Sequence, residues 1–218
     1  MKRLWMFSLL LCLGCYQKGQ EVTFLTPLIK HTDAQGNTKV YIARPKGEYA
    51  SIDIKDSHEA FVTLVSNSVQ PIFQFNMANR IGANPGIYNP SALLALGILR
   101  LRHKDYEQGA FFVRAALLRT YIDVQLSQDP SLQGLGQIMT QQVHQFVPNL
   151  NEEAFFKAWD AVADEVITWD KEVPRLYDRR WASLHSIGFY TQKPLNYLPL
   201  SEEPRIIEEA HDLFLNQS

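Results

Sequence analysis

Hydrophobic residues recur at helical spacing along most of the chain after about residue 57. The pattern is clearest over residues 90–102, rich in leucine, and over residues 106–128, where Ala110, Phe111 and Leu117 mark one face. Only His103-Lys104-Asp105 separates these two segments. Because so short a link leaves neighbouring helices antiparallel, the pattern predicts a helical hairpin.

Further helices are predicted where a capping residue or a proline precedes a periodic segment. Ser57 is the expected N-cap of a helix that ends near Ser68, and Asn151 is the expected N-cap of a helix that continues through Val162 and Val166. The remaining expected helices cover residues 72–81, 130–146 and 202–215.

Two segments near the start of the chain favour β-structure. Residues 22–29 and 39–43 are rich in β-forming residues, and the turn-forming cluster Asp33-Ala34-Gln35-Gly36-Asn37 lies between them. The prediction is a mostly α protein, a helical-hairpin bundle with a small N-terminal β-hairpin. Its expected parts are a β-hairpin region over residues 21–56 and a helical domain over residues 57–218.

The first fifteen residues have the layout of an export signal. Lys2 and Arg3 precede an apolar stretch, Leu4–Leu13, which is half of the ~20 residues that a membrane-spanning helix needs. The stretch ends in Leu13-Gly14-Cys15, which resembles the lipobox of bacterial lipoproteins. The resemblance implies a signal peptide over residues 1–14, lipidation of Cys15 and a lipidated tether over residues 15–20. An ordinary secretory signal cut nearby and an uncut apolar helix stay open as alternatives.

The expected location is the periplasmic face of the cell envelope. Tyr16 follows the cysteine where an aspartate often marks retention at the inner membrane, so by this resemblance the outer membrane is favoured. Both cysteines of the chain, Cys12 and Cys15, lie in this leader region. A disulfide within the helical domain and a cysteine-based zinc site are therefore excluded.

Residues 90–118 carry a motif of helical repeats. Leu96-Gly97, Lys104-Asp105-Tyr106-Glu107, Gly109 and Ala116 resemble the tetratricopeptide and Sel1-like pattern in residue type and spacing, for a repeat of roughly 34 residues. In that family small residues let two helices approach closely. The resemblance implies a helical hairpin that binds other proteins through a concave face.

Composition and the absence of known catalytic motifs narrow the range of possible functions. With 46% hydrophobic and 20% charged residues the chain is an ordinary globular protein, and its formal net charge of −2 gives no reason to expect nucleic-acid binding. No two of the six histidines have the spacing of a helical metal pair, and nucleophile elbows and nucleotide-binding glycine loops are missing. We therefore predict no catalytic residue, no metal and no cofactor.

Asp160 and Asp164 share one face and are expected on the solvated side of an amphipathic helix.

The most unusual polar cluster is Asp178, Arg179, Arg180 and Trp181. Arginine and tryptophan are overrepresented at binding hot spots, so these four residues are the candidate partner-binding site. The alternative is an Asp–Arg pair and a tryptophan that cover the end of the core.

The segment Tyr177–Trp181 with Leu184-His185 resembles helical lipoproteins associated with bacterial secretion systems. This resemblance implies a membrane-anchored protein-binding lipoprotein, and specifically an immunity protein that neutralises a secreted, type VI-like effector. The expected partner is a secreted effector or an envelope component, with the membrane contacted through the lipid. An envelope enzyme acting on peptidoglycan or lipid, and a structural lipoprotein of a secretion machine, are the alternatives.

Overall fold

The computed structural model describes residues 28–32, 38–42 and 45–216. The expected signal peptide, Cys15 and the tether lie outside these residues. Contacts divide the chain into one unit over Met1–Ala43 and a second over Arg44–Ser218. In the first unit, β1 (Leu28–Thr32) pairs antiparallel with β2 (Thr38–Ile42), and Leu28 lies opposite Ile42. The N-terminal β-hairpin as a stable part of the fold stays a prediction.

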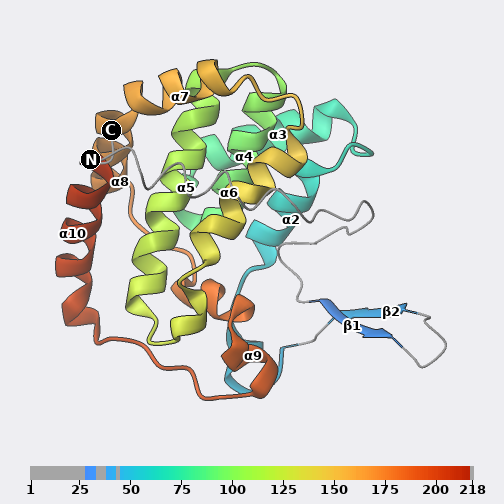
Figure 1. The fold of residues 1–218 in the computed structure, drawn as a ribbon, viewed down its shortest axis with the longest axis vertical. Helices are drawn as coiled ribbons and strands as arrows, with labels where there is room; N and C mark the ends of the chain where they lie inside the picture. The colour runs from blue at the N-terminus through green and yellow to red at the C-terminus, as the bar shows by residue number, and fades with distance from the viewer. Residues whose placement is uncertain (1–27, 33–37, 43–44, 217–218) are drawn as a thin grey trace. The chain divides into compact units, whose positions relative to one another are not determined.

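The second unit is helical, which confirms the predicted mostly α fold class (Figure 1). Short 3-10 turns join its α-helices. In chain order the elements are η1 (Gly47–Ser51), α2 (Lys55–Val65), α3 (Pro71–Ala83), η2 (Pro85–Ile87), α4 (Pro90–Arg102), α5 (Tyr106–Leu126), η3 (Pro130–Leu132), α6 (Leu135–Phe146), α7 (Glu152–Ala161), α8 (Ala163–Glu172), η4 (Arg179–His185), α9 (Ile187–Thr191), η5 (Leu200–Glu202) and α10 (Glu203–Leu215).

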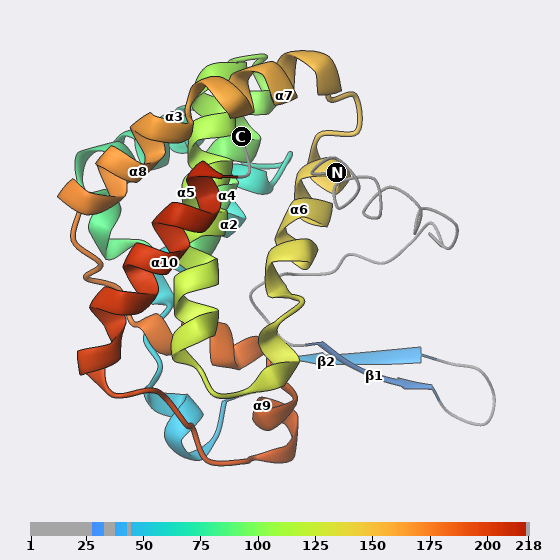
Figure 2. The same ribbon diagram turned by 60° about the vertical axis from the view of Figure 1, so that its left-hand side comes forward.

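Helix α5 is the centre of the helical unit. It contacts α4, α6, α7, α8 and α10, and both views show α10 lying along it (Figures 1 and 2). The core is therefore built around α4 and α5, where leucine and alanine side chains such as Leu94, Leu96, Ala115 and Leu118 are almost completely buried. Burial of this apolar surface is the main force that holds the surrounding helices in place.

The predicted hairpin of residues 90–102 and 106–128 is confirmed as α4 and α5. Asn89 caps α4 by accepting a hydrogen bond from the backbone N–H of Ser91, and Asp105 caps α5 by accepting one from Gln108. Lys104 makes the turn between them with a positive φ of 63°. A Cβ at Gly97 would meet Val113, and one at Gly109 would meet Leu101. These pairings show that the helices are antiparallel and that the two glycines allow their close approach.

A Gly97→Ala substitution is expected to destabilise the protein by ~1–3 kcal/mol. Its Cβ would lie 2.7 Å from Val113 Cγ2 and 2.9 Å from Val113 N, so one of the two helix backbones must shift. Urea unfolding followed by circular dichroism measures the change. The matched control is Gly136→Ala in α6, where a Cβ meets nothing within 4 Å. The control is expected to be neutral or stabilising, because alanine has the higher helix propensity. Equal effects of the two substitutions would contradict the close-packing explanation.

Three expected helix boundaries are wrong. The helix expected over residues 130–146 begins only at Leu135, because Pro130–Leu132 form the separate 3-10 turn η3. Ser57 does not cap α2, because that helix begins at Lys55 and the Ser57 hydroxyl accepts a hydrogen bond from the backbone of Asn89 (2.9 Å). The helix capped by Asn151 ends at Ala161, and Val162 separates it from α8. The hydrophobic spacing continues across this break, because Val162 and Val166 are both buried. Asp160 and Asp164 consequently lie on different helices, and both are exposed.

Candidate functional site

The predicted cluster of Asp178, Arg179, Arg180 and Trp181 lies at the start of η4. Asp178 is the N-cap of this turn and accepts a hydrogen bond from the backbone N–H of Arg180 (3.0 Å). Trp181 is fully buried, and its Nε1 donates to Asp123 Oδ2 of α5 (2.7 Å). Trp181 therefore fastens η4 to the centre of the bundle and has no surface to present to a partner.

The carboxyl group of Asp123 is the internal anchor of this region. Its Oδ2 also accepts a hydrogen bond from the Tyr177 hydroxyl (3.0 Å), whereas Oδ1 has no hydrogen-bond partner among the described residues. Burial raises the pKa of Asp123 to about 7, although the hydrogen bonds from Trp181 and Tyr177 act to lower it. The Asp123 carboxyl therefore keeps its proton to a higher pH than an ordinary aspartate does.

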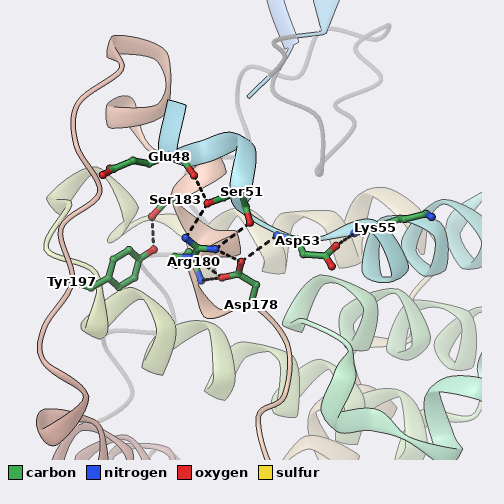
Figure 3. A network of polar contacts seen from close by, with 8 residues as sticks. All are labelled: Glu48, Ser51, Asp53, Lys55, Asp178, Arg180, Ser183 and Tyr197. Carbon is green, nitrogen blue, oxygen red and sulfur yellow. Dashed lines mark hydrogen bonds and ion pairs between the residues drawn. The ribbon is translucent and has the colours of Figure 1, made fainter. Parts of the chain in front are cut away.

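Asp178 and Arg180 form an ion pair that joins η4 to the segment before α2 (Figure 3). Arg180 donates from Nε to Asp178 Oδ1 (2.9 Å) and from Nη2 to Asp178 Oδ2 (2.7 Å). The same guanidinium donates to the hydroxyl and the carbonyl of Ser51, at 3.1 Å each, and Asp178 also accepts from the backbone N–H of Asp53 (3.1 Å). We call this set of contacts, among Ser51, Asp53, Asp178 and Arg180, the polar clamp.

The electrostatics of the polar clamp follow from this geometry. Burial acts to raise the pKa of Asp178, but the hydrogen bonds from Arg180 outweigh it and hold that pKa below its ordinary value. Hydrogen bonding to Asp178 likewise raises the pKa of Arg180. Both groups are therefore charged at neutral pH. The Arg180 side chain is still 39% exposed, so the clamp can be reached from solvent.

Arg179 has a different structural partner. It forms an ion pair with Glu203, the first residue of α10, and the two side chains are 25% and 21% exposed. The four sequence-predicted residues thus contact three separate parts of the bundle. Two of them, Asp178 and Arg180, belong to one accessible cluster.

A hollow of about 390 Å³ adjoins the polar clamp. It lies between the start of α2, the turn η2 and the segment that leads to η4. Its lining comprises charged residues, partly buried polar groups and an apolar edge: Asp53, Ile54, Lys55, Asp56, Ser57, Ile87, Leu176, Tyr177 and Asp178. Leu176 is 63% exposed, and Tyr177 connects the hollow to Asp123 beneath it. The hollow therefore offers both charges and apolar surface to a bound group.

A second polar network, centred on Asp170 of α8, is buried deeper in the helical unit. Arg119 Nε donates to Asp170 Oδ1 (2.8 Å), and His211 Nε2 lies 2.8 Å from Oδ2, which also forms an ion pair with Arg175. The Arg119 guanidinium in addition lies 4.2 Å from the centre of the Trp169 ring. Burial acts to raise the pKa of Asp170, but these donors outweigh it and lower that pKa. The network joins α5, α8 and α10.

The sequence pattern does not predict the Asp123 and Asp170 networks. The available signal was an arginine and an aspartate, Arg119 and Asp123, on a helix whose other positions are largely apolar. Within residues 28–32, 38–42 and 45–216, no group of three or more His, Cys, Asp or Glu side chains is arranged to hold a metal ion. Over the same part of the chain, no helix combines the length and the apolar character needed to cross a bilayer.

Comparisons of this chain with protein-family models, with curated proteins and with solved structures found no match.

Proposed function

We propose that this protein is a membrane-anchored, periplasmic protein-binding lipoprotein that captures a partner at the hollow beside the polar clamp. Lipid on Cys15 would hold it on the envelope, with the outer membrane favoured. The observation that carries the proposal is the position of the hollow, which is lined by Asp178, the ion-pair partner of Arg180. Both residues belong to the Asp178–Trp181 cluster, the candidate partner-binding site of the sequence.

The chemistry of the hollow favours a protein partner. Asp53 and Asp56 present exposed carboxylates, Lys55 presents an ammonium group, and the edge is apolar at Leu176 and Ile87. A protruding side chain with an aliphatic stem and a charged head would contact both kinds of surface. Because the polar clamp fixes the backbone around the hollow, little ordering is needed when a partner binds.

The specific form that we propose is an immunity protein that neutralises a secreted, type VI-like effector. The finer fold features are part of the same proposal, namely a tetratricopeptide or Sel1-like relationship for α4 and α5 and a small N-terminal β-hairpin. A structural lipoprotein of a secretion machine would use the same hollow on a resident envelope partner.

The test is capture of a partner from detergent-solubilised envelope, with the full chain as bait and mass spectrometry as the readout. Asp56→Lys reverses an exposed charge at the hollow and is expected to reduce capture at least about tenfold. Glu208→Lys, an equal reversal at an exposed position of α10, is the control and is expected to keep full capture.

The outcomes of this experiment separate the candidates. The immunity role would be supported if the captured protein were an effector encoded beside this chain. Its capture should then be lost with Asp56→Lys and kept with Glu208→Lys. Resident envelope components would favour the structural role. Capture that is equal for both variants and the parent chain would contradict the assignment of the hollow.

An envelope enzyme acting on peptidoglycan or lipid is the second candidate, because one observation favours it. The buried Asp123 carboxyl has an oxygen without a partner among the described residues, and Tyr177 links it to the hollow. Buried, adjacent titratable groups next to a concavity are typical of active sites. Hydrolysis of cell-wall or lipid substrates that is lost in Asp123→Asn, with folding intact, would support the enzyme and overturn the binding role.

A further inference from the structure

The turn between α2 and α3 and the first turns of α3 carry the largest concentration of exposed apolar side chains in the described helical unit. We call residues 66–76 the α2–α3 tip. Within it Ile72, Phe73 and Phe75 are 55%, 58% and 61% exposed. Large apolar side chains are more often buried, so three exposed ones within four residues make this segment a candidate contact surface. The hollow and the polar clamp do not use these residues.

The α2–α3 tip is also free of charge. No aspartate, glutamate, lysine, arginine or histidine occurs between Glu59 and Arg80, although charged residues make up 20% of the chain. These two bounding residues form an ion pair with each other, at 3.6 Å between Arg80 Nη1 and Glu59 Oε1. An apolar medium could therefore surround the tip without removing any charged group from water.

Several backbone carbonyls at the tip and just before it are hydrogen-bonded within the chain. The last carbonyls of a helix normally need partners from outside it, and here the Gln74 side-chain amide donates to those of Thr63, Leu64 and Ser66 (3.4, 3.4 and 2.9 Å). At the start of α3, Pro71 has no N–H to satisfy, and the Gln70 carbonyl accepts hydrogen bonds from Phe73 and Gln74. Hydrocarbon surroundings require this kind of internal satisfaction, whereas a water-exposed tip does not.

We propose that the α2–α3 tip inserts into the interfacial region of a lipid bilayer and forms a second membrane contact beside the lipid anchor. This inference rests on the proposed function for the presence of a nearby membrane. Because the tip has no basic residue, it is suited to the apolar boundary of the bilayer and has no cation for lipid headgroup charges.

The experiment places an environment-sensitive fluorophore on the tip of the full chain, through an Asn76→Cys substitution, in vesicles of phosphatidylcholine that contain a lipid-borne quencher. The expected result is strong quenching at position 76 and little quenching at the control position, Glu208→Cys, which is exposed on α10. Adding Phe73→Ser and Phe75→Ser is expected to abolish the quenching and to lower tip insertion more than about tenfold. The matched control is Leu200→Ser, which removes an exposed apolar side chain from η5 and is expected to change nothing.

Two measurements together separate insertion of the tip from lipidation of Cys15. Mass spectrometry of the N-terminal peptide from the same preparation reports whether Cys15 carries lipid. A lipidated protein on vesicles without quenching at position 76 would overturn tip insertion alone. Quenching at position 76 in a Cys12→Ser, Cys15→Ser chain, which has no lipid and no second thiol for the fluorophore, would sustain the inference independently of the anchor. A fluorophore that responds only to added envelope proteins, and not to vesicles, would assign the tip to a protein partner and overturn the bilayer contact.

Discussion

Replacing Asp170 with alanine is expected to destabilise the protein by ~3–5 kcal/mol, which is a large share of the stability of a typical domain. The Asp170 side chain is fully buried, and so is that of Arg119. Removing the carboxylate would leave the Arg119 guanidinium inside the bundle without its ion-pair partner. It would also release Arg175 and His211, so that α10 loses a polar connection to α5 and α8.

Urea unfolding of the two proteins at pH 7 measures this loss, and Asp164→Ala is the matched control. Asp164 is on the same helix but exposed, so the control is expected to change stability by less than about 0.5 kcal/mol. If Asp170→Ala were as stable as the control, the buried network would not contribute to folding as described.

The pKa of Asp170 also gives this network a pH dependence. Because the folded state lowers that pKa, the contribution of Asp170 is present above its unfolded pKa of about 3.9 and is lost as pH falls through the folded value. The stability difference between the parent chain and Asp170→Ala should therefore shrink in strong acid. A difference that is constant from neutral to acidic pH would contradict the charge-based explanation.

Local signals explain which parts of the fold were predictable. The α4–α5 hairpin was predictable because its determinants are close in sequence: Pro90 in the first turn, Gly97 and Gly109 at the helix contact, and a turn ending at Asp105. Asn151 likewise caps α7 through the backbone N–H of Ala154. A side chain that caps or spaces a helix acts within a few residues, so the sequence pattern contains the necessary information.

The networks were not predictable, because their partners are brought together only by the tertiary fold. Asp170 bonds to Arg119 and His211, which are 51 and 41 positions away in the chain. Trp181 and Tyr177 share the Asp123 carboxyl, 58 and 54 positions distant. From the order Asp-Arg-Arg-Trp alone, a surface cluster and a buried anchor are equally compatible. Burial decides between them, and the structure places the tryptophan inside and leaves Arg180 partly accessible.

For Asp178 and Arg180 the structure shows the structural alternative, and the binding role stays a proposal. Asp178 and Arg180 pair with each other and tie η4 to Ser51 and Asp53, which is a structural role. The same contacts shape one side of the hollow, so loss of the clamp would also change the proposed binding surface. Substitutions of the clamp itself therefore cannot separate the two roles. For this reason the proposed test of binding uses Asp56, which lines the hollow without joining the clamp.

The second large expected effect is a pH dependence of stability that Asp123→Asn removes. In the folded protein burial raises the pKa of Asp123 to about 7, against about 3.9 for an unfolded aspartate. The folded state therefore binds the proton more tightly than the unfolded state does. The Asp123 contribution to stability is full below about pH 4, declines as pH rises through about 7, and is constant above that.

A shift of about three pKa units corresponds to ~4 kcal/mol between the two limits, as an order of magnitude. Asparagine keeps an oxygen that can accept from Trp181 and Tyr177, and it does not ionise. The free energy of unfolding of the Asp123→Asn variant should therefore lack this decline. Relative to the parent chain, the variant should become more stable as pH rises from about 4 to about 8. Urea unfolding across that range, followed by tryptophan fluorescence, measures the difference directly. A difference that stays constant with pH would mean that Asp123 titrates alike in both states, and it would remove the physical basis for treating this buried carboxyl as the central anchor of η4.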